Sequence, residues 1–196
     1  DSHLGEQAGD RLLNLDTDES LSAVLALTAK QWNDADILLA TGDIASHASV
    51  SAYQRFQALT QHIAPDTLWL PGNHDDPALM EQALGGSLVK SATVGGWLII
   101  MLDSTVKGQP GGSFSQQELH YLEGQLKEAG DNHVLLCLHH HPVDIGSAWL
   151  DEQRVSNADA FFSIVDRYPQ VKGLLWGHVH QQVDVERNGL QLMATP

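Results

Sequence analysis

Short apolar runs alternate with amphipathic segments along this chain. Each run is bounded by polar residues and is too short for a typical helix, so we interpret these runs as β-strands. Two of them, at 36–41 and 134–138, have unbroken apolar cores, which is typical of strands covered on both faces. The strands predicted in this way are 36–41, 67–70, 134–138 and 171–176.

Apolar residues that recur every three or four positions predict helices between the strands. The first helix is expected to begin near Thr17 or Asp18, a capping box of Ser115 and Glu118 begins another, and Pro65 ends a third. The predicted helices cover 17–32 (inner face Leu21, Val24, Leu25, Thr28, Ala29 and Trp32), 49–63, 77–84, 115–130 and 157–168.

Two turn signals predict β-hairpins. They are Gly95-Gly96, between strands expected at 91–94 and 97–102, and Asn188-Gly189, within 182–194. Residues 4–16 are polar and are expected to form a loop, and 143–154 is a polar connection. Alternating strands and helices, together with hairpins, predict an α/β architecture with a mixed sheet.

The size and charge of the chain restrict its class. With 196 residues, 42% of them hydrophobic, the chain can bury the core of one domain, and we predict a single domain over 1–196. Ten Lys and Arg against 25 Asp and Glu give a net charge of −15. This charge disfavours nucleic acids and anionic membranes as partners, because both are polyanions. A phosphate substrate would therefore need positive charge from bound metal.

The single cysteine, Cys137, lies in an apolar run, where we expect a buried thiol and no internal disulfide. That fits a reducing cytosol, and no apolar run approaches membrane-spanning length, so we expect a cytoplasmic protein. The chain starts on two candidate functional residues, Asp1 and His3, and 190–196 stops within a predicted strand. We expect a longer protein with an N-terminal strand and a C-terminal segment outside this sequence.

Polar side chains follow the predicted strands at their carboxyl ends, where ligands bind in α/β sheets. Any one of them could be a structural histidine, a turn or a helix cap. Nine together favour a functional site. They are Asp1, His3, Asp43, Asn73, His74, Asp75, His140, His178 and His180.

The chemistry of this set favours metal. Histidine, aspartate and asparagine offer nitrogen and oxygen without a thiolate, which suits Mn, Fe, Zn or Co. In Asp1-x-His3 and His178-x-His180 an extended backbone would point both side chains to the same side. The set is too large for one ion, so we predict two, with the Asp43 carboxylate as the bridge.

Five motifs in order resemble those of the calcineurin-like metallophosphoesterases. They are Asp1-x-His3, Gly42-Asp43, Gly72-Asn73-His74-Asp75, His140-x-Pro142 and Gly177-His178-x-His180. The resemblance implies a four-layer αββα sandwich with mixed sheets and a dinuclear metal site. It also implies that one ion is held by Asp1, His3, Asp43 and His180, and the other by Asp43, Asn73, His140 and His178.

The same resemblance gives His74 the catalytic position facing the phosphate, with Asp75 orienting it. In the run of three histidines, the H-x-P spacing selects His140 as the ligand, because Pro142 follows two residues later. His139 would then point away, and His141 would reach the substrate pocket; the assignment of these two stays open. The other histidines, His47, His62, His120 and His133, are expected on the surface.

A closer likeness is to the bacterial class III 3′,5′-cyclic-AMP phosphodiesterases. It is carried by His139-His140-His141-Pro142, Ala148-Trp149-Leu150-Asp151 and Trp176-Gly177-His178-Val179-His180-Gln181. It implies metal-dependent hydrolysis of cyclic AMP to 5′-AMP, with iron and manganese as the first choice of metals and zinc or cobalt as alternatives. The substrate-binding residues would be Asn73, His74, His141 and Trp149.

Three alternatives remain at this stage. The substrate could be another small phosphoester, such as a glycerophosphodiester. The chain could instead be a non-catalytic metal-binding regulatory module, although the presence of His74, which would bind no metal, argues against that. A structural domain with surface histidines would bind no stoichiometric metal. The sequence leaves the choice between adenine and guanine, and the oligomeric state, open.

Overall fold

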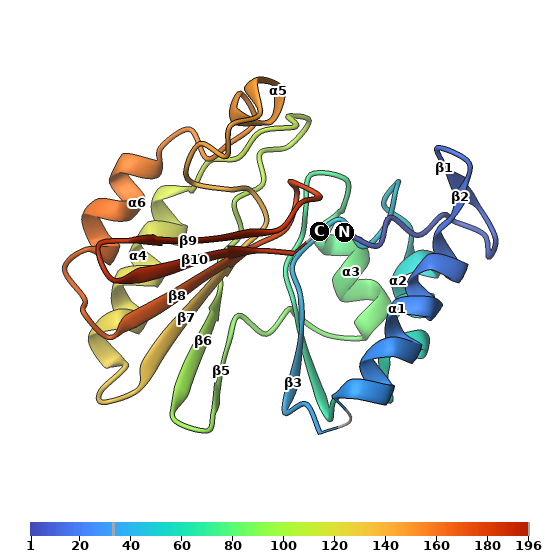
Figure 1. Ribbon diagram of the computed structural model, residues 1–196, viewed down its shortest axis with the longest axis horizontal. Coiled ribbons are helices and arrows are strands. Elements are labelled where there is room, and N and C mark those ends of the chain that lie inside the picture. The colour runs from blue at the N-terminus through green and yellow to red at the C-terminus, as the bar shows by residue number, and fades with distance from the viewer. Residues whose placement is uncertain (33, 196) are drawn as a thin grey trace. The chain divides into compact units, whose positions relative to one another are not determined.

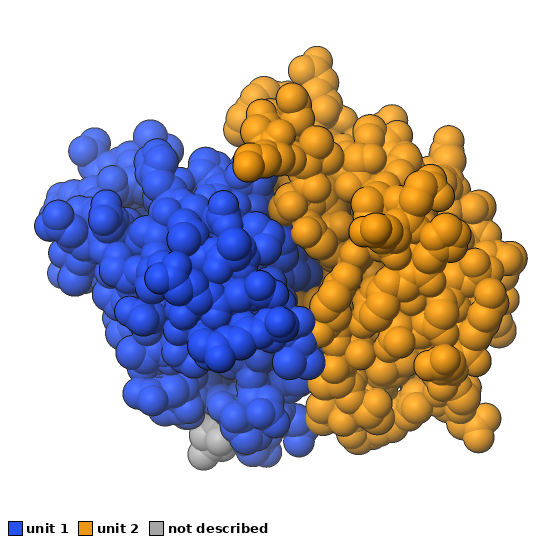
Figure 2. Space-filling model, turned by 180° about the vertical axis from the view of Figure 1, so that it is seen from behind, with its two compact units in different colours: residues 1–89 blue, residues 90–196 orange. Residues whose placement is uncertain are grey.

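The computed structural model describes residues 1–32 and 34–195. The chain divides into two compact units, residues 1–89 and 90–196, which Figure 2 colours separately. The predicted single domain over 1–196 stays a prediction, and the two units are described one at a time below.

Unit 1 combines helices with short strands (Figure 1). Strands β3 and β4 pair in parallel, with Ile37 opposite Asp66 and Ala40 opposite Trp69. A small antiparallel hairpin, β1–β2, lies within 4–16, the segment expected to be a loop. The elements are β1 (Arg11–Leu12), β2 (Leu15–Asp16), α1 (Thr17–Gln31), β3 (Ile37–Ala40), α2 (Val50–Thr60), β4 (Asp66–Trp69) and α3 (Pro77–Leu84).

The helices of unit 1 begin where short polar side chains cap them. Asp16, Ser49 and Asp76 each accept a hydrogen bond from a backbone N–H of the first turn. Helix α3 ends on Gly85, whose φ of 72° is a left-handed conformation that suits glycine. Local sequence therefore fixes these helix limits close to the predicted ones.

Helix α1 differs from its prediction in what it buries. Of its predicted inner face, only Leu25 is buried, whereas Val24 is 58% and Trp32 61% exposed. A period of 3.6 residues identifies an apolar face, but it does not say how much of that face another element covers. The expectation that β3 is buried on both faces is also wrong, because only Ala40 of that strand is buried.

Unit 2 is built on a six-stranded mixed sheet of order β5-β6-β7-β8-β10-β9. Strands β6, β7, β8 and β10 run parallel, and β5 and β9 close the two edges as antiparallel hairpin strands. The elements are β5 (Ser91–Val94), β6 (Trp97–Met101), α4 (Gln116–Glu128), β7 (His133–Leu138), α5 (Ala148–Asp151), α6 (Ala158–Val165), β8 (Val171–Trp176), β9 (Val183–Arg187) and β10 (Leu190–Ala194).

Both predicted hairpins of unit 2 are present. Gly95 and Gly96 have φ of 53° and 82°, and Asn188 and Gly189 have φ of 53° and 80°. Two successive positive φ angles give the turn whose twist matches paired strands, which explains the glycine and asparagine there. Helix α5, within the segment 143–154, was not predicted.

The core of unit 2 lies between the sheet and helices α4 and α6, which lie side by side (Figure 1). Leu122 and Leu126 of α4 and Phe161 of α6 are almost completely buried in one cluster with Leu136 and Trp176 of the sheet. Cys137 is fully buried in β7, as predicted, and burial raises the pKa of its thiol to about 12. The sheet is therefore a firm support for the loops at its carboxyl edge.

The capping box at the start of α4 forms only in part. Ser115 accepts from Glu118 N (3.0 Å), but the Glu118 carboxylate accepts instead from Asp103 N (2.9 Å) and from Lys90 Nζ (2.6 Å). Glu118 is only 8% exposed, so it ties the loop after β6 to the helix.

Replacing Glu118 by alanine should therefore cost roughly 1–3 kcal/mol of unfolding free energy, because the half-buried amide of Asp103 and the Lys90 ammonium both lose their acceptor. Urea denaturation measures this value. Glu128→Ala, an exposed change at the other end of α4, is the control and should cost less than about 0.5 kcal/mol; equal losses would contradict the proposed link.

Candidate metal centre

The first residues of the chain pair with the loop that follows β3. His3 N donates to Asp43 O (3.0 Å) and Leu4 N to Ile44 O (2.9 Å), while Ser46 N donates back to Leu4 O (3.0 Å). Leu4 is completely buried and forms a parallel bridge with Ala45. Residues 40 or more positions apart are thereby held side by side.

This pairing gathers the polar residues of unit 1 into a donor cluster, which consists of Asp1, His3, Asp43 and His74. One ligand atom each of His3, Asp43 and His74 lie within 4.8 Å of one another, and the Asp1 carboxylate lies within the same distance of His3 and of Asp43. His3 Nε2 is 3.7 Å from Asp43 Oδ2, and both residues are buried. The structure therefore brings together four of the predicted site residues.

His74 is oriented by two backbone contacts. Its N–H donates to Asp43 Oδ1 (2.9 Å), and its ring Nδ1 is 2.9 Å from Ser46 O. A carbonyl oxygen can only accept, so Nδ1 carries the hydrogen and Nε2 is the nitrogen left for chemistry. His74 is exposed. No sequence signal pointed to Ser46, because its contribution is a backbone carbonyl.

Asp75 makes four hydrogen bonds that join two loops. Its Oδ2 accepts from Ile44 N (3.1 Å) and Gly72 N (3.0 Å), and its Oδ1 from Ala45 N (3.1 Å) and Tyr53 Oη (3.1 Å). Burial raises the pKa of Asp75, while the amide donors oppose the rise and the Asp43 charge adds to it. Asp75 thus fixes the loop that carries Asp43, whereas the His74 ring is held by Ser46.

Asn73 lies in the turn that is closed by the hydrogen bond from Asp75 N to Gly72 O (3.1 Å). Its side chain is half-buried. It therefore belongs to the same turn as His74, as the motif predicted.

Unit 2 carries a second donor cluster, which consists of His139, His140 and His178. Strands β7 and β8 are neighbours that end together, with Leu138 opposite Trp176, so the histidines that follow them meet. One ring nitrogen of each of the three lies within 4.8 Å of the others, and all three residues are buried. The His139 and His178 ring centroids are 5.1 Å apart.

The His140 ring is enclosed by the loop after β6. Ser104 Oγ lies 2.8 Å from Nδ1 and accepts from His140 N (3.2 Å), and Pro110 O lies 3.2 Å from Nε2. A Cβ at Gly112 would stand 2.7 Å from the ring, so glycine is needed there. Both ring nitrogens of His140 therefore have protein partners, which would have to be released before this ring could hold an ion. The choice of His140 remains an untested prediction.

The two remaining predicted substrate residues differ in their surroundings. His141 is completely buried, stacks on His178 at 5.9 Å, and has Nε2 3.7 Å from Asp151 Oδ1. Burial lowers the pKa of His141, and the Asp151 charge opposes this. Trp149, in α5, is 70% exposed. The substrate-binding role of His141, which packs beside His178, and that of Trp149, which has an exposed face, stay predictions.

The backbone at the candidate ligands is unusual. His3, Asp43, His178 and His180 have φ of 46°, 48°, 66° and 48°. Left-handed conformations are uncommon outside glycine and mark sites where the fold holds a side chain in a required direction. The expectation of an extended backbone in the two paired motifs is therefore wrong, although His180 does follow His178 at the end of β8 as predicted.

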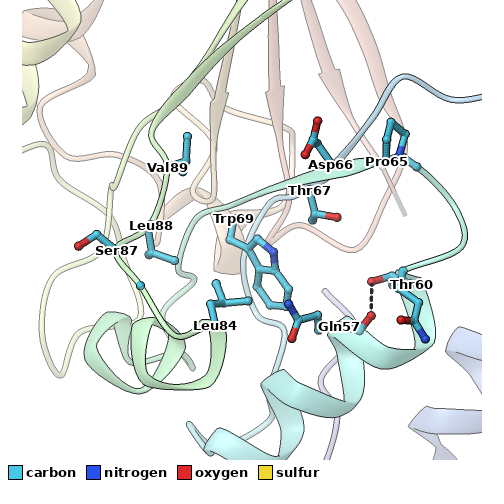
Figure 3. A pocket seen from close by; sticks show the side chains of 13 residues that line it. Gln57, Thr60, Pro65, Asp66, Thr67, Trp69, Leu84, Ser87, Leu88 and Val89 are labelled. Carbon is cyan, nitrogen blue, oxygen red and sulfur yellow. Dashed lines mark hydrogen bonds between the residues drawn. The ribbon is translucent and has the colours of Figure 1, made fainter.

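A cavity of about 330 Å³ lies elsewhere in unit 1 (Figure 3). The end of α2, the beginning of β4 and the segment after α3 surround it, and the Trp69 ring stands between Gln57 and Leu84. Asp66 is the one carboxylate among its lining residues, so it offers no cluster of metal donors.

Known proteins identify the class of this chain. The sequence profile of calcineurin-like phosphoesterases matches residues 1–182, which contain all five motifs. The chain belongs to the calcineurin-like phosphoesterase family, which confirms the predicted resemblance. Members of this family are hydrolases with a dinuclear metal site. Nitrogen and oxygen donors without a thiolate, as found in both donor clusters, fit that chemistry.

Individual relatives carry names that are more specific than the description of the family. The chain is 39% identical to the 3′,5′-cyclic adenosine monophosphate phosphodiesterase CpdA of Pseudomonas aeruginosa, over 100% of this chain and 73% of the relative. It is 41% identical to the protein of the same name from Escherichia coli, with the same two coverages.

A solved structure supports the fold. A dimetal phosphatase from Danio rerio superposes with a TM-score of 0.68 at 15% identity, covering 97% of this chain and 85% of the other. At this identity the likeness shows the fold alone, and it confirms the predicted metallophosphoesterase fold class. Within the described residues, no helix is both long and apolar enough to cross a membrane.

Asp75→Ala should lower the unfolding free energy by roughly 3–5 kcal/mol, because three amides and the Tyr53 hydroxyl lose their shared acceptor. Urea denaturation of metal-free protein measures this. Asp76→Ala removes only the N-cap of α3 and should cost about 1 kcal/mol. A loss at Asp75 no larger than that at Asp76 would refute its role in joining the two loops.

Proposed function

We propose that this protein hydrolyses 3′,5′-cyclic AMP to 5′-AMP at a dinuclear metal centre. The observation that carries the proposal is the donor cluster of unit 1, in which an exposed histidine, His74, is fixed beside Asp43 by the loop contacts described above. The names of the relatives, which span this whole chain, support the substrate.

The proposed ligands come from both donor clusters and their neighbours. Asp43, whose carboxylate is buried, is proposed to bridge the ions. The others are Asp1, His3, Asn73, His178, His180 and, in place of His140, His139. We propose iron and manganese as the metals, with zinc or cobalt as substitutes, because imidazole and carboxylate donors suit all four.

Bound there, the two ions would supply the Lewis acidity and the local positive charge that hydrolysis of a phosphodiester requires. This resolves the conflict between an anionic substrate and a chain of net charge −15. The chain's own residues would orient the substrate, because Asn73 lies in the same turn as His74, a member of the donor cluster of unit 1.

His74 is proposed to act as the general acid. When water adds to phosphorus and the bond from phosphorus to O3′ breaks, the leaving oxygen needs a proton. The Ser46 carbonyl keeps a hydrogen on Nδ1, so the imidazolium can give its Nε2 proton to O3′ and become a neutral imidazole protonated at Nδ1. Asp75 contributes indirectly, by holding the loop on which Asp43 and Ser46 lie.

The test is hydrolysis of cyclic AMP and of bis(p-nitrophenyl) phosphate, after chelation and after Mn or Fe is added back. Cleavage of both, only with metal, is expected. Cleavage of the generic diester alone would reject cyclic AMP as the substrate and keep the chemistry. Activity on neither would favour a metal-binding module without catalysis.

His74→Ala should reduce kcat for cyclic AMP by roughly 10²-fold, the usual effect of losing a general acid, and leave the metal content unchanged. Steady-state kinetics and metal analysis measure the two quantities. His62→Ala, a change at an exposed histidine outside both donor clusters, should leave kcat unchanged. An unaltered kcat in His74→Ala would remove this residue from the mechanism.

A second prediction separates His139 from His140. His139→Ala should lower the bound metal per chain, whereas His140→Ala should retain it and lower the unfolding free energy by roughly 2–4 kcal/mol, because the Ser104 contact and the ring volume are lost. Metal analysis after dialysis, with urea denaturation, gives both values. The opposite pattern would restore His140 as the ligand.

A further inference from the structure

Unit 1 contains a second feature beside its donor cluster, a cavity of about 340 Å³ that no step of the proposed mechanism uses. His3 lines it, and so do Ser46 and His47 of the loop that follows Asp43. The other wall is the segment from Gly5 to Leu12, together with Thr17. Because His3 belongs both to the donor cluster and to the cavity wall, the cavity adjoins the donor cluster.

The walls of this cavity are firmly built. Arg55 of α2 donates to the carbonyls of Gly5 and Glu6 and binds Asp18 through Nε (2.6 Å), so it holds the segment that precedes the hairpin. A Cβ on Gly5 would collide with the side chain of Asp10. The shape of the cavity therefore depends on particular residues, as expected for a binding site.

The β1–β2 hairpin that carries Arg11 and Leu12 is strained at its tip. Leu13 and Asn14 have φ of 49° and 70°, and Leu13 is 93% exposed. A leucine in a left-handed conformation is uncommon and is kept only where the surrounding structure requires it. Arg11, on the strand that leads into this turn, is one of the residues that line the cavity.

Arg11 is the one Lys or Arg among the lining residues, and unit 1 contains only two others, Lys30 and Arg55. Within the described part of the chain, its guanidinium makes one long hydrogen bond, from Nη1 to Asn14 O (3.5 Å). Arg55, in contrast, is engaged by Asp18 and by backbone carbonyls. The guanidinium plane of Arg11 is therefore open to a ligand.

The chemistry of the cavity selects its occupant. Glu6 and Asp10 line it, and their carboxylates would repel a second phosphate. A purine base suits the same residues, because its face stacks on a guanidinium or an imidazole and its amino group donates to a carboxylate. Leu12 adds an apolar contact.

We infer that this cavity binds the nucleoside part of the substrate, with Arg11 and His47 contacting the base. The inference rests on the proposed function, since it places the rest of a cyclic nucleotide whose phosphate is bound at the donor cluster. Arg11 is then a specificity-determining residue, needed for a nucleotide and not for a diester that lacks a nucleoside.

The experiment compares wild type with Arg11→Ala on cyclic AMP and on bis(p-nitrophenyl) phosphate. Arg11→Ala should raise KM for cyclic AMP about 10-fold, as expected for the loss of one stacking contact, and change kcat/KM for the generic diester less than about 2-fold. Arg11→Lys keeps the positive charge but removes the planar guanidinium, so it should also raise KM for cyclic AMP. Lys30→Ala, the matched loss of an exposed cation, should leave the kinetic constants for both substrates unchanged.

Adenosine, which has no phosphate, provides a readout independent of cyclic AMP turnover. It should inhibit hydrolysis of the generic diester competitively in wild type, with Ki about 10-fold higher in Arg11→Ala. Equal losses on both substrates, an unchanged KM for cyclic AMP or an unchanged Ki would overturn the inference.

Failure of the proposed function gives a different result. Wild type would then cleave only the generic diester, or neither substrate, while adenosine binding, measured by inhibition or by calorimetry, would still decide the inference. Adenosine binding that is weakened by Arg11→Ala supports the cavity even in that case, and no adenosine binding at all overturns it.

Discussion

The carboxylate of Asp75 is the contact on which the arrangement of unit 1 depends. It accepts from amides in the loops that follow β3 and β4, at Ile44, Ala45 and Gly72, and from the hydroxyl of Tyr53 in α2. One carboxylate thus holds the loops after two strands and a helix together. Asp43 precedes Ile44, which Asp75 binds, and His74 precedes Asp75 itself, so both candidate residues depend on this carboxylate for their positions.

Much of this fold could be predicted, because the deciding signals are local. Helix α3 and strands β5 and β8 have the limits that their caps, turns and apolar runs indicated. The burial of α1 could not be predicted, because the exposure of Val24 depends on what other elements cover. The β1–β2 hairpin was missed because Leu13 and Asn14 are not the residues that usually adopt positive φ in tandem.

The candidate site shows the same division between local and non-local information. Motif spacing selected the candidate side chains, and within each unit the structure brings several of them together. The choice within the three histidines depends on partners far along the chain, Ser104 and Pro110, and on the space left by Gly112. The orientation of His74 depends on a carbonyl at Ser46, which any residue type could provide.

The pairing of residues 2–4 with 43–46 has a consequence for assembly. Asp1 and His3 reach Asp43 only when a loop of about 40 residues has closed, and closing such a loop costs conformational entropy. An ion that binds His3 and Asp43 together favours the closed state over every open one, so metal affinity and the docking of the first residues are thermodynamically linked. Loss of metal would therefore weaken the pairing of residues 2–4 with 43–46.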